Sequence, residues 1–294
     1  MKKYKILVTG GSGFLGSHLV DCIDKAGHKA IIFDSIKSNY VKETQKQIVG
    51  SILDAKLVQK SVKNCDYVFH FAAIADIEKS KNNPNETIKN NILGTQILLD
   101  ACVKNKIKRF IFASTIYVYS NLGSFYRLSK QTCESLIEEY SKEFGLKYTI
   151  LRFGSLYGTR ANQFNSIRNI IIQAIEKKQI VRHSNGEEIR EYIHVKDAAE
   201  LSFNMIKKEF SNKHFIITGN QSLKIKELLV LIREIFNNKI KIIYKKNKYD
   251  SHYEILPYSY KPQMAKKITP NPSYELGEGI LEIIYEIDNR SIKR

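Results

Sequence analysis

The feature that most constrains how this chain folds is a glycine-rich turn near its start. Residues 10–16 read GGSGFLG, with Gly10, Gly13 and Gly16 spaced by three between a short apolar segment and an amphipathic one. A turn of bare backbone between a strand and a helix closes tightly. It lets a pyrophosphate approach the helix N-terminus, where unpaired N–H groups and the helix dipole favour negative charge. Because the turn stands between a predicted strand and a predicted helix, it indicates a dinucleotide site.

After the turn, short apolar segments alternate with amphipathic ones through the first half of the chain. This alternation is typical of a parallel sheet that helices cover on both faces. The sequence therefore predicts an α/β protein with a doubly wound parallel sheet. The expected strands are 4–9, 29–34, 67–71, 109–114 and 148–153, and the expected helices are 14–26, 86–105 and 126–144.

From about residue 154 the alternation loosens. We expect a strand at 214–217 that rejoins the sheet, and a long ordered excursion at 241–272, a kind of segment that is usually functional in a compact domain. This pattern predicts a dinucleotide-binding domain over 1–160, rejoined by segments near 190–220, and a smaller C-terminal substrate-binding part over 161–294. The helices expected in this half are 166–177, 195–208, 224–236 and 279–287.

Composition narrows the classes of function. The net charge of +17 comes from 47 Lys and Arg against 30 Asp and Glu, but the lysines are spread along the chain and form no basic tail, so we expect no nucleic-acid partner. The apolar runs are too short to span a bilayer, and no long apolar region follows the first residues. We therefore expect a cytoplasmic protein without a membrane partner. The four cysteines have no metal-type spacing, which predicts reduced thiols and no metal site.

Six further motifs follow the glycine turn in a fixed order. They are HFAA at 70–73, NILGT at 91–95, FAST at 112–115, YRLSK at 126–130, LRF at 151–153 and REYIHV at 190–195. In this order the chain resembles the extended short-chain dehydrogenase/reductase family, the group of NAD-dependent nucleotide-sugar epimerases, dehydratases and dehydrogenases. The resemblance covers residues 4–235. It implies a Rossmann fold, a nucleotide-sugar substrate, and a homodimer or homotetramer packed through the long helices at 86–105 and 126–144.

The expected cofactor is NAD. Asp34 ends the second predicted strand, where a carboxylate accepts hydrogen bonds from the adenosine ribose hydroxyls and repels a 2′-phosphate. Lys37 lies close by in sequence and weakens this exclusion of NADP. Ser51 stands where the family commonly has an Asp that contacts the adenine. The NAD site implied by the resemblance comprises Gly10, Gly13, Phe14, Leu15, Gly16, Asp34, Ser51, Ile52, Phe71, Ala72, Ala73, Ser114, Tyr126 and Lys130.

Tyr126 and Lys130 are the expected catalytic pair. They are four residues apart and share one face of a helix. A nearby ammonium and the positive nicotinamide favour tyrosinate, which makes Tyr126 a better base near neutral pH. The resemblance implies that Tyr126 takes the proton of a sugar hydroxyl while hydride leaves the same carbon, and that Lys130 also holds the nicotinamide ribose. It implies as well that Thr115 hydrogen-bonds the reacting hydroxyl, while Ser114 faces the core or the cofactor.

Arg190 is the residue expected at the substrate pyrophosphate, since a guanidinium makes bidentate, charge-assisted bonds to phosphate. The alternative is a surface arginine paired with Glu187 or Glu188. Arg160 is a second candidate for a phosphate contact, and His194 is expected to be structural. The expected substrate-binding residues are Asn91, Thr115, Tyr126, Ser155, Asn165 and Arg190.

Four positions depart from the family pattern or leave alternatives open. Asn91 either anchors active-site backbone or water, or caps a helix. Ile116 and Tyr117 follow Thr115 where sugar dehydratases of the family carry an acidic residue and decarboxylases a Glu, so simple redox at carbon 4 is expected. Ser155 replaces an Asn that 4-epimerases often have.

The loop at 120–125 is shorter than is usual in the family. With Ser155, it favours a 4-dehydrogenase of an activated sugar, such as a GDP-linked hexose or heptose, in surface-polysaccharide synthesis. A nucleotide-sugar 4-epimerase is the first alternative. A non-catalytic NAD-binding regulator is the second, although it would be expected to have a damaged Tyr/Lys pair, and here the pair is intact.

Overall fold

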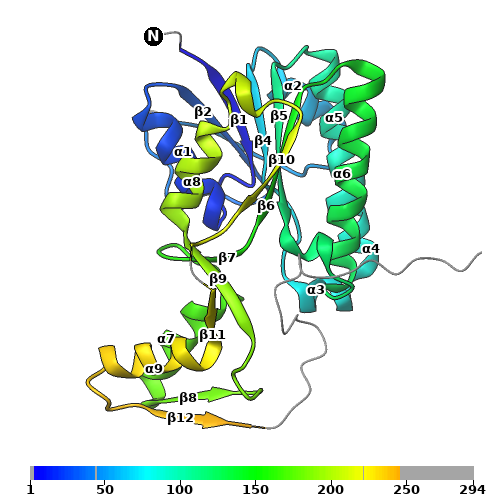
Figure 1. Ribbon diagram of the computed structural model, residues 1–294. Coiled ribbons are helices and arrows are strands. Elements are labelled where there is room, and N and C mark those ends of the chain that lie inside the picture. Colours follow the sequence, from blue (N-terminus) through cyan, green and yellow to red (C-terminus); the bar gives the residue numbers. More distant parts are fainter. Residues whose placement is uncertain (1–2, 44, 221, 246–294) are drawn as a thin grey trace, which may run out of the picture. The chain divides into compact units, whose positions relative to one another are not determined.

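The computed structural model describes residues 3–43, 45–220 and 222–245 (Figure 1). All of these residues belong to one compact unit, Met1–Tyr260, and a second unit, Lys261–Arg294, lies outside the described residues. The helix expected at 279–287 and most of the excursion expected at 241–272 also lie outside them. The start of the predicted excursion is ordered, since Lys241–Tyr244 forms strand β12, which was not predicted as a strand.

The main element is a seven-stranded parallel sheet. Its order is β10-β6-β5-β4-β1-β2-β3, so the chain starts near the middle and winds outward in both directions, as expected for a doubly wound sheet. Most of its strands are near-continuous apolar segments, because helices bury them on both faces. The strands are β1 Lys5–Thr9, β2 Lys29–Asp34, β3 Lys46–Val49, β4 Tyr67–His70, β5 Arg109–Thr115, β6 Tyr148–Phe153 and β10 Lys213–Ile217.

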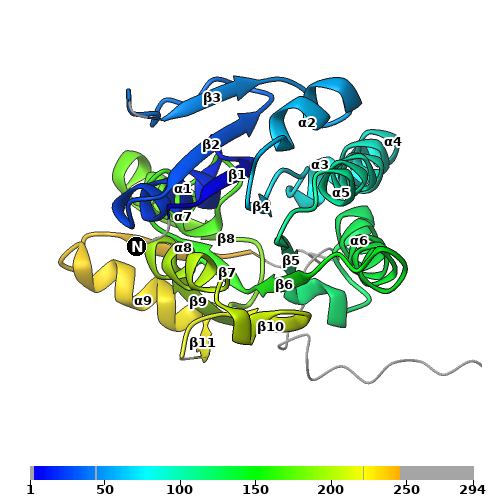
Figure 2. The ribbon, with the colours of Figure 1, turned by 90° about the horizontal axis from the view of Figure 1, so that it is seen from above.

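Helices cover the two faces of this sheet, as Figure 2 shows from above. On one face α1 (Phe14–Lys25) packs against α8 (Val195–Asn204) over an apolar core that includes Leu19 and Ile111. On the other face α2 (Ala55–Val62), α5 (Gly94–Lys104) and α6 (Ser124–Phe144) enclose a second core. The strand expected at 214–217 is confirmed as β10. The sequence analysis missed β3 and α2, and α8 ends four residues before the expected bound.

The helix expected at 86–105 is interrupted in its middle. It is built from α4 (Pro84–Thr87), a π-helical segment (Ile88–Leu93) and α5 (Gly94–Lys104), with the short helix α3 (Ile77–Asn82) just before it. A π-helical segment inserts an extra residue per turn and is common at functional sites. Here it holds Asn91, whose side chain is buried.

The remaining described strands form a smaller cluster with α7 and α9. It contains a three-stranded sheet of β11, β9 and β7 and a parallel pair of β8 and β12, and most of its elements share a separate apolar core, whereas Leu156 of β7 packs against the core of the main sheet. The domain boundary near residue 160 stays a prediction. Helix α8 and strand β10 lie later in the chain and belong to the layers of the main sheet, in the region 190–220 that was expected to rejoin it. The elements are β7 Ser155–Tyr157, α7 Ser166–Lys177, β8 Gln179–Arg182, β9 Ile189–His194, β11 Ser222–Lys224, α9 Ile225–Ile235 and β12 Lys241–Tyr244.

Candidate active site

A cavity of about 760 Å³ lies at the carboxyl edge of the main sheet. It is lined by residues that end or follow strands, among them Gly10 after β1, Asp34 of β2, Phe71 after β4 and Thr115 of β5. Ligands of open α/β sheets bind at this edge, where the strand order reverses. The cavity also reaches residues of β7, α7, β8 and β9, so one hollow joins the glycine turn to the smaller cluster.

The glycine turn has the geometry that a pyrophosphate site needs. Gly10 has a φ of +70°, and a Cβ there would lie 2.6 Å from the backbone nitrogen of Ala72. A Cβ on Gly16 would overlap the carbonyl oxygen of Gly10. α1 starts after Gly13, and none of the described side chains caps its first N–H groups. Bare backbone at the start of a helix therefore faces the cavity, which is what a bound anion requires.

Asp34 lies at the adenosine end of the predicted cofactor site. Its carboxylate accepts hydrogen bonds from the backbone N–H of Ser12 at 2.9 Å and of Ile36 at 3.2 Å, which fixes it at the cavity wall. Lys37 does not line the cavity among the described residues, whereas Asp34 does. The other predicted NAD contacts on the wall are Gly10, Gly13, Phe14, Leu15, Gly16, Ser51, Ile52, Phe71, Ala72, Ala73, Ser114, Tyr126 and Lys130.

Lys130 is held deep in the cavity by α6. Its Nζ donates a hydrogen bond to the carbonyl oxygen of Ala113 at 2.6 Å and lies 4.5 Å from the centre of the Phe112 ring and 5.9 Å from that of Tyr126. Only 3% of the residue is exposed, and burial lowers the pKa of Lys130 to about 8. Desolvation destabilises the ammonium, while Cys133 and Glu134 oppose that effect.

Tyr126 and Thr115 meet across the cavity. Both side chains line it, and α6 brings Tyr126 to the end of β5, where Thr115 stands. Burial raises the pKa of Tyr126 to about 12, and the nearby hydroxyl of Thr115 opposes this rise. Tyrosinate was expected from a nearby ammonium together with the positive nicotinamide. In the protein groups alone desolvation of the phenolate dominates and keeps Tyr126 protonated near neutral pH, so the expectation stays a prediction for the complex with NAD.

The loop before α6 is short and tightly packed. α6 starts at Ser124, two residues before the expected bound, because Gly123 adopts a φ of +99° and turns the chain. A Cβ on Gly123 would lie 2.7 Å from the Tyr117 ring, so a glycine lets the loop close against that side chain. Tyr117 lines the cavity, whereas Ile116 is only 2% exposed and faces the core.

Asn91 lies behind the cavity wall. Its amide accepts from the backbone N–H of Ile74 at 2.8 Å, donates to the Ile74 carbonyl at 3.1 Å, and donates to Ser129 Oγ at 2.9 Å. The predicted direct substrate contact was therefore wrong, since this amide is fully engaged and does not line the cavity. The alternative, an anchor for active-site backbone, agrees with these bonds, because Ser129 in turn donates to the carbonyl of Tyr126.

The smaller cluster supplies the far end of the cavity. Arg190 lines it and is 8% exposed, with Nη1 donating to the Ile189 carbonyl at 2.8 Å. Glu187 pairs with Lys224 and Lys226, and Glu188 pairs with Arg182 at 2.8 Å, so the alternative of a surface arginine does not hold. The cavity wall here also includes the predicted contacts Ser155 and Asn165, the second of which caps α7.

Arg160 is turned away from the cavity. Its Nη1 lies 2.8 Å from a carboxylate oxygen of Asp21, and its guanidinium stacks over Tyr40. The predicted phosphate contact was therefore wrong, because Asp21 of α1 already holds the charge. His194 precedes α8 and packs edge-on against Tyr157, in agreement with the structural role expected for it.

Arg182 and Tyr117 are among the cavity-lining residues that were not predicted from the sequence. Arg182 is on β8, a strand that was not predicted either, and its Nε donates to Ser184 at 3.0 Å. A short apolar segment before Gly186 was the only sequence signal for that strand. Tyr117 was noted only for not being a carboxylate, yet its place two residues after Thr115 was the available signal.

Within 3–43, 45–220 and 222–245, no helix is long and apolar enough to cross a membrane. Over the same residues, no group of three or more His, Cys, Asp or Glu side chains is arranged to hold a metal ion.

Comparison with known proteins gives one consistent family. Residues 6–218 match the model of the NAD dependent epimerase/dehydratase family. A UDP-N-acetyl-alpha-D-glucosaminuronate decarboxylase from Bacillus cytotoxicus is 30% identical over 98% of this chain and 100% of its own length. A putative UDP-glucose 4-epimerase from Methanocaldococcus jannaschii is 27% identical over 97% of this chain and 99% of its own.

Solved structures lead to the same group. The UDP-glucose 4-epimerase of Thermotoga maritima, crystallised with UDP-glucose, superposes with a TM-score of 0.79 at 28% identity, covering 85% of this chain and 88% of its own. The UDP-N-acetylglucosamine 4-epimerase of Methanobrevibacter ruminantium, in complex with UDP-N-acetylmuramic acid, has the same TM-score and identity over 90% and 94%.

Proposed function

Because the chain belongs to the NAD-dependent epimerase/dehydratase family, we propose that it is a UDP-sugar 4-epimerase, which oxidises carbon 4 of the sugar and then reduces it from the opposite face. The resemblance seen in the sequence is thereby confirmed, and NAD is the cofactor. The observation that carries the proposal is the single cavity, in which the glycine turn and Asp34 lie together with Tyr126, Lys130 and Thr115.

The residues after Thr115 argue against elimination and decarboxylation. Ile116 is buried in the core, and Tyr117 presents a phenol to the cavity where a dehydratase or decarboxylase of this family would be expected to carry an acid. Among the described residues, two carboxylates besides Asp34 line the cavity, but Asp76 caps α3 and Glu86 Oε1 lies 3.9 Å from Lys79 Nζ. Similarity to a decarboxylase therefore does not extend to the group that reaction needs.

The described residues fit NAD. The turn at Gly10 and Gly16 excludes even a Cβ and leaves the N-terminus of α1 to a pyrophosphate, and Asp34 presents a fixed carboxylate to a ribose. When bound, NAD supplies a hydride acceptor and a positive charge in the same cavity. Lys130 would hold the nicotinamide ribose, and small residues such as Ala72 and Ala73 leave room at the wall.

Tyr126 would act as the general base and Thr115 as the partner of the reacting hydroxyl. The phenol and the Thr115 hydroxyl both line the cavity, so a sugar hydroxyl that enters between them meets two groups that can each donate or accept a hydrogen bond. General bases work best with a pKa near the working pH, and the pKa of Tyr126 lies far above that range in the protein alone. Added positive charge near the phenol would lower this pKa and make proton abstraction feasible.

The far end of the cavity favours a nucleotide diphosphate. Arg190 and Arg182 both line it, and a guanidinium suits a phosphate group through paired N–H donors. The two solved relatives at 28% identity were crystallised with UDP compounds, which favours a UDP-sugar over the GDP-linked sugar expected from the sequence. The role in polysaccharide synthesis stays a prediction, as do the oligomeric state and the cytoplasmic location.

A 4-dehydrogenase is the second candidate. The short loop of residues 120–125 favours this reaction. An epimerase must hold its ketone intermediate while the sugar rotates, and a short loop covers that intermediate less. The product separates the two reactions: the dehydrogenase accumulates reduced cofactor and a ketone, whereas the epimerase returns an isobaric sugar.

The test is a turnover assay with the wild type, Tyr126→Phe and Tyr140→Phe. Tyr140 is on the same helix, but its hydroxyl bonds Asp100 and it does not line the cavity, so it is the matched control. UDP-, GDP-, dTDP- and CDP-sugars are supplied with NAD, absorbance of reduced nicotinamide is followed, and products are resolved by mass and NMR. We expect an isobaric 4-epimer from a UDP-sugar, lost in Tyr126→Phe and retained in Tyr140→Phe. If no sugar is turned over while NAD still binds, the result would instead favour a non-catalytic NAD-binding regulator.

A further inference from the structure

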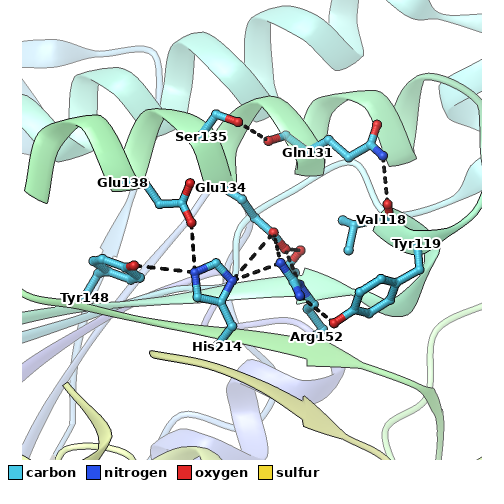
Figure 3. Close-up of polar contacts among 10 residues, drawn as sticks. Val118, Tyr119, Gln131, Glu134, Ser135, Glu138, Tyr148, Arg152 and His214 are labelled. Atoms are coloured by element: carbon cyan, nitrogen blue, oxygen red, sulfur yellow. Dashed lines mark hydrogen bonds and ion pairs between the residues drawn. The ribbon is translucent and has the colours of Figure 1, made fainter. Parts of the chain in front are cut away.

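A buried ion pair lies beside the active site, between α6 and the main sheet (Figure 3). Arg152 of β6 donates from Nε to Glu134 Oε1 at 3.1 Å and from Nη2 to Glu134 Oε2 at 2.6 Å. The two side chains are 17% and 9% exposed, and neither lines the cavity among the described residues. Forked pairing of this kind fixes the relative orientation of both groups.

The ion pair reaches both ends of the segment that carries Thr115. Ser114 Oγ donates to Glu134 Oε1 at 2.5 Å, just before Thr115 in the chain. Arg152 Nη1 donates to the hydroxyl of Tyr119 at 2.5 Å, and the guanidinium lies 4.8 Å from the centre of that ring. Tyr119 ends the short 3-10 turn Ile116–Tyr119, so residues 115–118 are fastened at either end to the same two side chains.

The same pair is fixed to the catalytic helix. Tyr126, Lys130 and Glu134 are spaced by four on α6, so they lie along one face of the helix. A second contact joins α6 to the segment, since Gln131 Nε2 donates to the carbonyl of Val118 at 2.8 Å (Figure 3). The placement of Thr115 relative to Tyr126 therefore depends on contacts made outside the cavity.

His214, on the edge strand β10, is a further hydrogen-bond partner of Arg152. Arg152 Nη2 lies 2.9 Å from His214 Nδ1, and because a guanidinium only donates, Nδ1 must accept. The proton of the neutral ring is then on Nε2, which lies 3.0 Å from a carboxylate oxygen of Glu138. Nε, Nη1 and Nη2 of Arg152 thus each have a partner, and the guanidinium has a single well-defined orientation.

We propose that Arg152 is a positioning residue for the reaction: through Glu134 and Tyr119 it holds residues 115–118 so that Thr115 and Tyr117 face Tyr126. This proposal rests on the catalytic roles proposed above for Tyr126 and Thr115. The Arg152 guanidinium hydrogen-bonds Glu134 and Tyr119, not Thr115 or Tyr126, so its side chain acts through the two ends of the segment; the backbone pairing of β6 with β5 is the same in any Arg152 variant. His214 holds the guanidinium in the orientation that lets Nη1 reach Tyr119.

Two substitutions separate positioning from simple stability. A lysine in Arg152→Lys keeps the positive charge beside Glu134, but its single ammonium does not reproduce a planar fork that spans Glu134, Tyr119 and His214. Tyr119→Phe removes only the hydroxyl at the far end of the segment. Arg109→Lys is the matched control: Arg109 is a buried arginine at the other end of β5, bonded to the carbonyls of Met205 and Lys207.

The first measurement is steady-state kinetics with the best sugar substrate, together with Tm. Displacement of a reacting group by about 1 Å costs up to about a hundredfold in rate, so we expect kcat to fall at least about tenfold in Arg152→Lys and Tyr119→Phe. KM and the affinity for NAD should change by less than about threefold, since the cavity wall itself is intact. Unchanged kcat in both variants, or an equal loss in Arg109→Lys, would overturn the proposal.

The second measurement does not need turnover. The N–H groups of Tyr117 and Ser120 are hydrogen-bonded within the segment, so hydrogen exchange at 115–120 reports whether it is held. We expect faster exchange there in Arg152→Lys and Tyr119→Phe, and wild-type exchange in Arg109→Lys. Unchanged exchange in the first two refutes the positioning role. If the wild type turns over no sugar, faster exchange at 115–120 in Arg152→Lys and Tyr119→Phe would still support the positioning role and would refute the proposed function alone.

Discussion

The buried amine of Lys130 gives the protein a characteristic dependence of stability on pH. In the folded protein burial lowers the pKa of Lys130 to about 8, while an unfolded lysine keeps its ordinary value of 10.5. Between these two values the unfolded chain binds more protons than the folded one. The free energy of unfolding contributed by this group therefore rises with pH through that window, and the group is at its most destabilising below pH 8.

The size of the effect follows from the two pKa values. Below both, the cost of keeping Lys130 charged in the folded state is about 3 kcal/mol. Integrating the difference in bound protons from about pH 7 to about pH 9.5 relieves about 2 kcal/mol of this cost. Above about pH 10 the raised pKa of Tyr126 acts in the opposite direction, so the range should stop below it.

The assay is urea unfolding of nucleotide-free wild type and Lys130→Met at these two pH values. Burial raises the pKa of Cys65 to about 11, and this loss of stability at high pH is shared by both proteins and cancels in the difference. We expect the wild type to gain about 2 kcal/mol relative to Lys130→Met as the pH rises. Equal pH dependence in the two proteins would refute the conclusion that the folded state depresses the pKa of Lys130.

Three further outcomes test other parts of the site. Gly16→Ala places a Cβ on the carbonyl of Gly10, so we expect loss of NAD binding in titration calorimetry and about 1–3 kcal/mol of stability in urea unfolding. Asp34→Ala removes the carboxylate that repels a 2′-phosphate, and the ratio of the Kd for NADP to that for NAD should fall at least about tenfold; an unchanged ratio would count against this reading of Asp34. Arg190→Lys should raise KM about tenfold with little effect on kcat, whereas Arg160→Lys, bound to Asp21 instead, should leave both near wild type.

Much of the candidate site could be predicted because its residues stand at fixed offsets from strand ends. The turn at Gly10, the carboxylate of Asp34 and the hydroxyl of Thr115 each end or follow a strand of a parallel sheet, and such ends meet at one edge. Tyr126 and Lys130 needed only helical spacing to share a face. The structure places all five residues on the wall of the same cavity.

Other features of the site depended on contacts between distant segments. Asn91 was assigned to the substrate, yet the π-helical segment turns its amide onto Ile74. The pKa of Tyr126 was expected to fall near Lys130 and the nicotinamide, whereas in the protein alone desolvation raises it. Arg160 was considered for phosphate, and Asp21 of α1 holds it elsewhere. In each case the side chain had several chemically reasonable surroundings, and packing determined which of them it has.

The sequence by itself predicted the fold class through local periodicity, and the order of its motifs predicted an NAD site and the Tyr126/Lys130 pair, whose residues the structure places on one cavity wall. Only the tertiary structure decided which side chains beyond that pair face the cavity, and how Arg152, Glu134 and His214 meet. The physical reason is that β10, which lies far from α6 and β6 in sequence, is brought beside them by the burial of apolar surface. The energy of a polar group then depends on the water it loses and the partner it gains, neither of which is encoded in its neighbours along the chain.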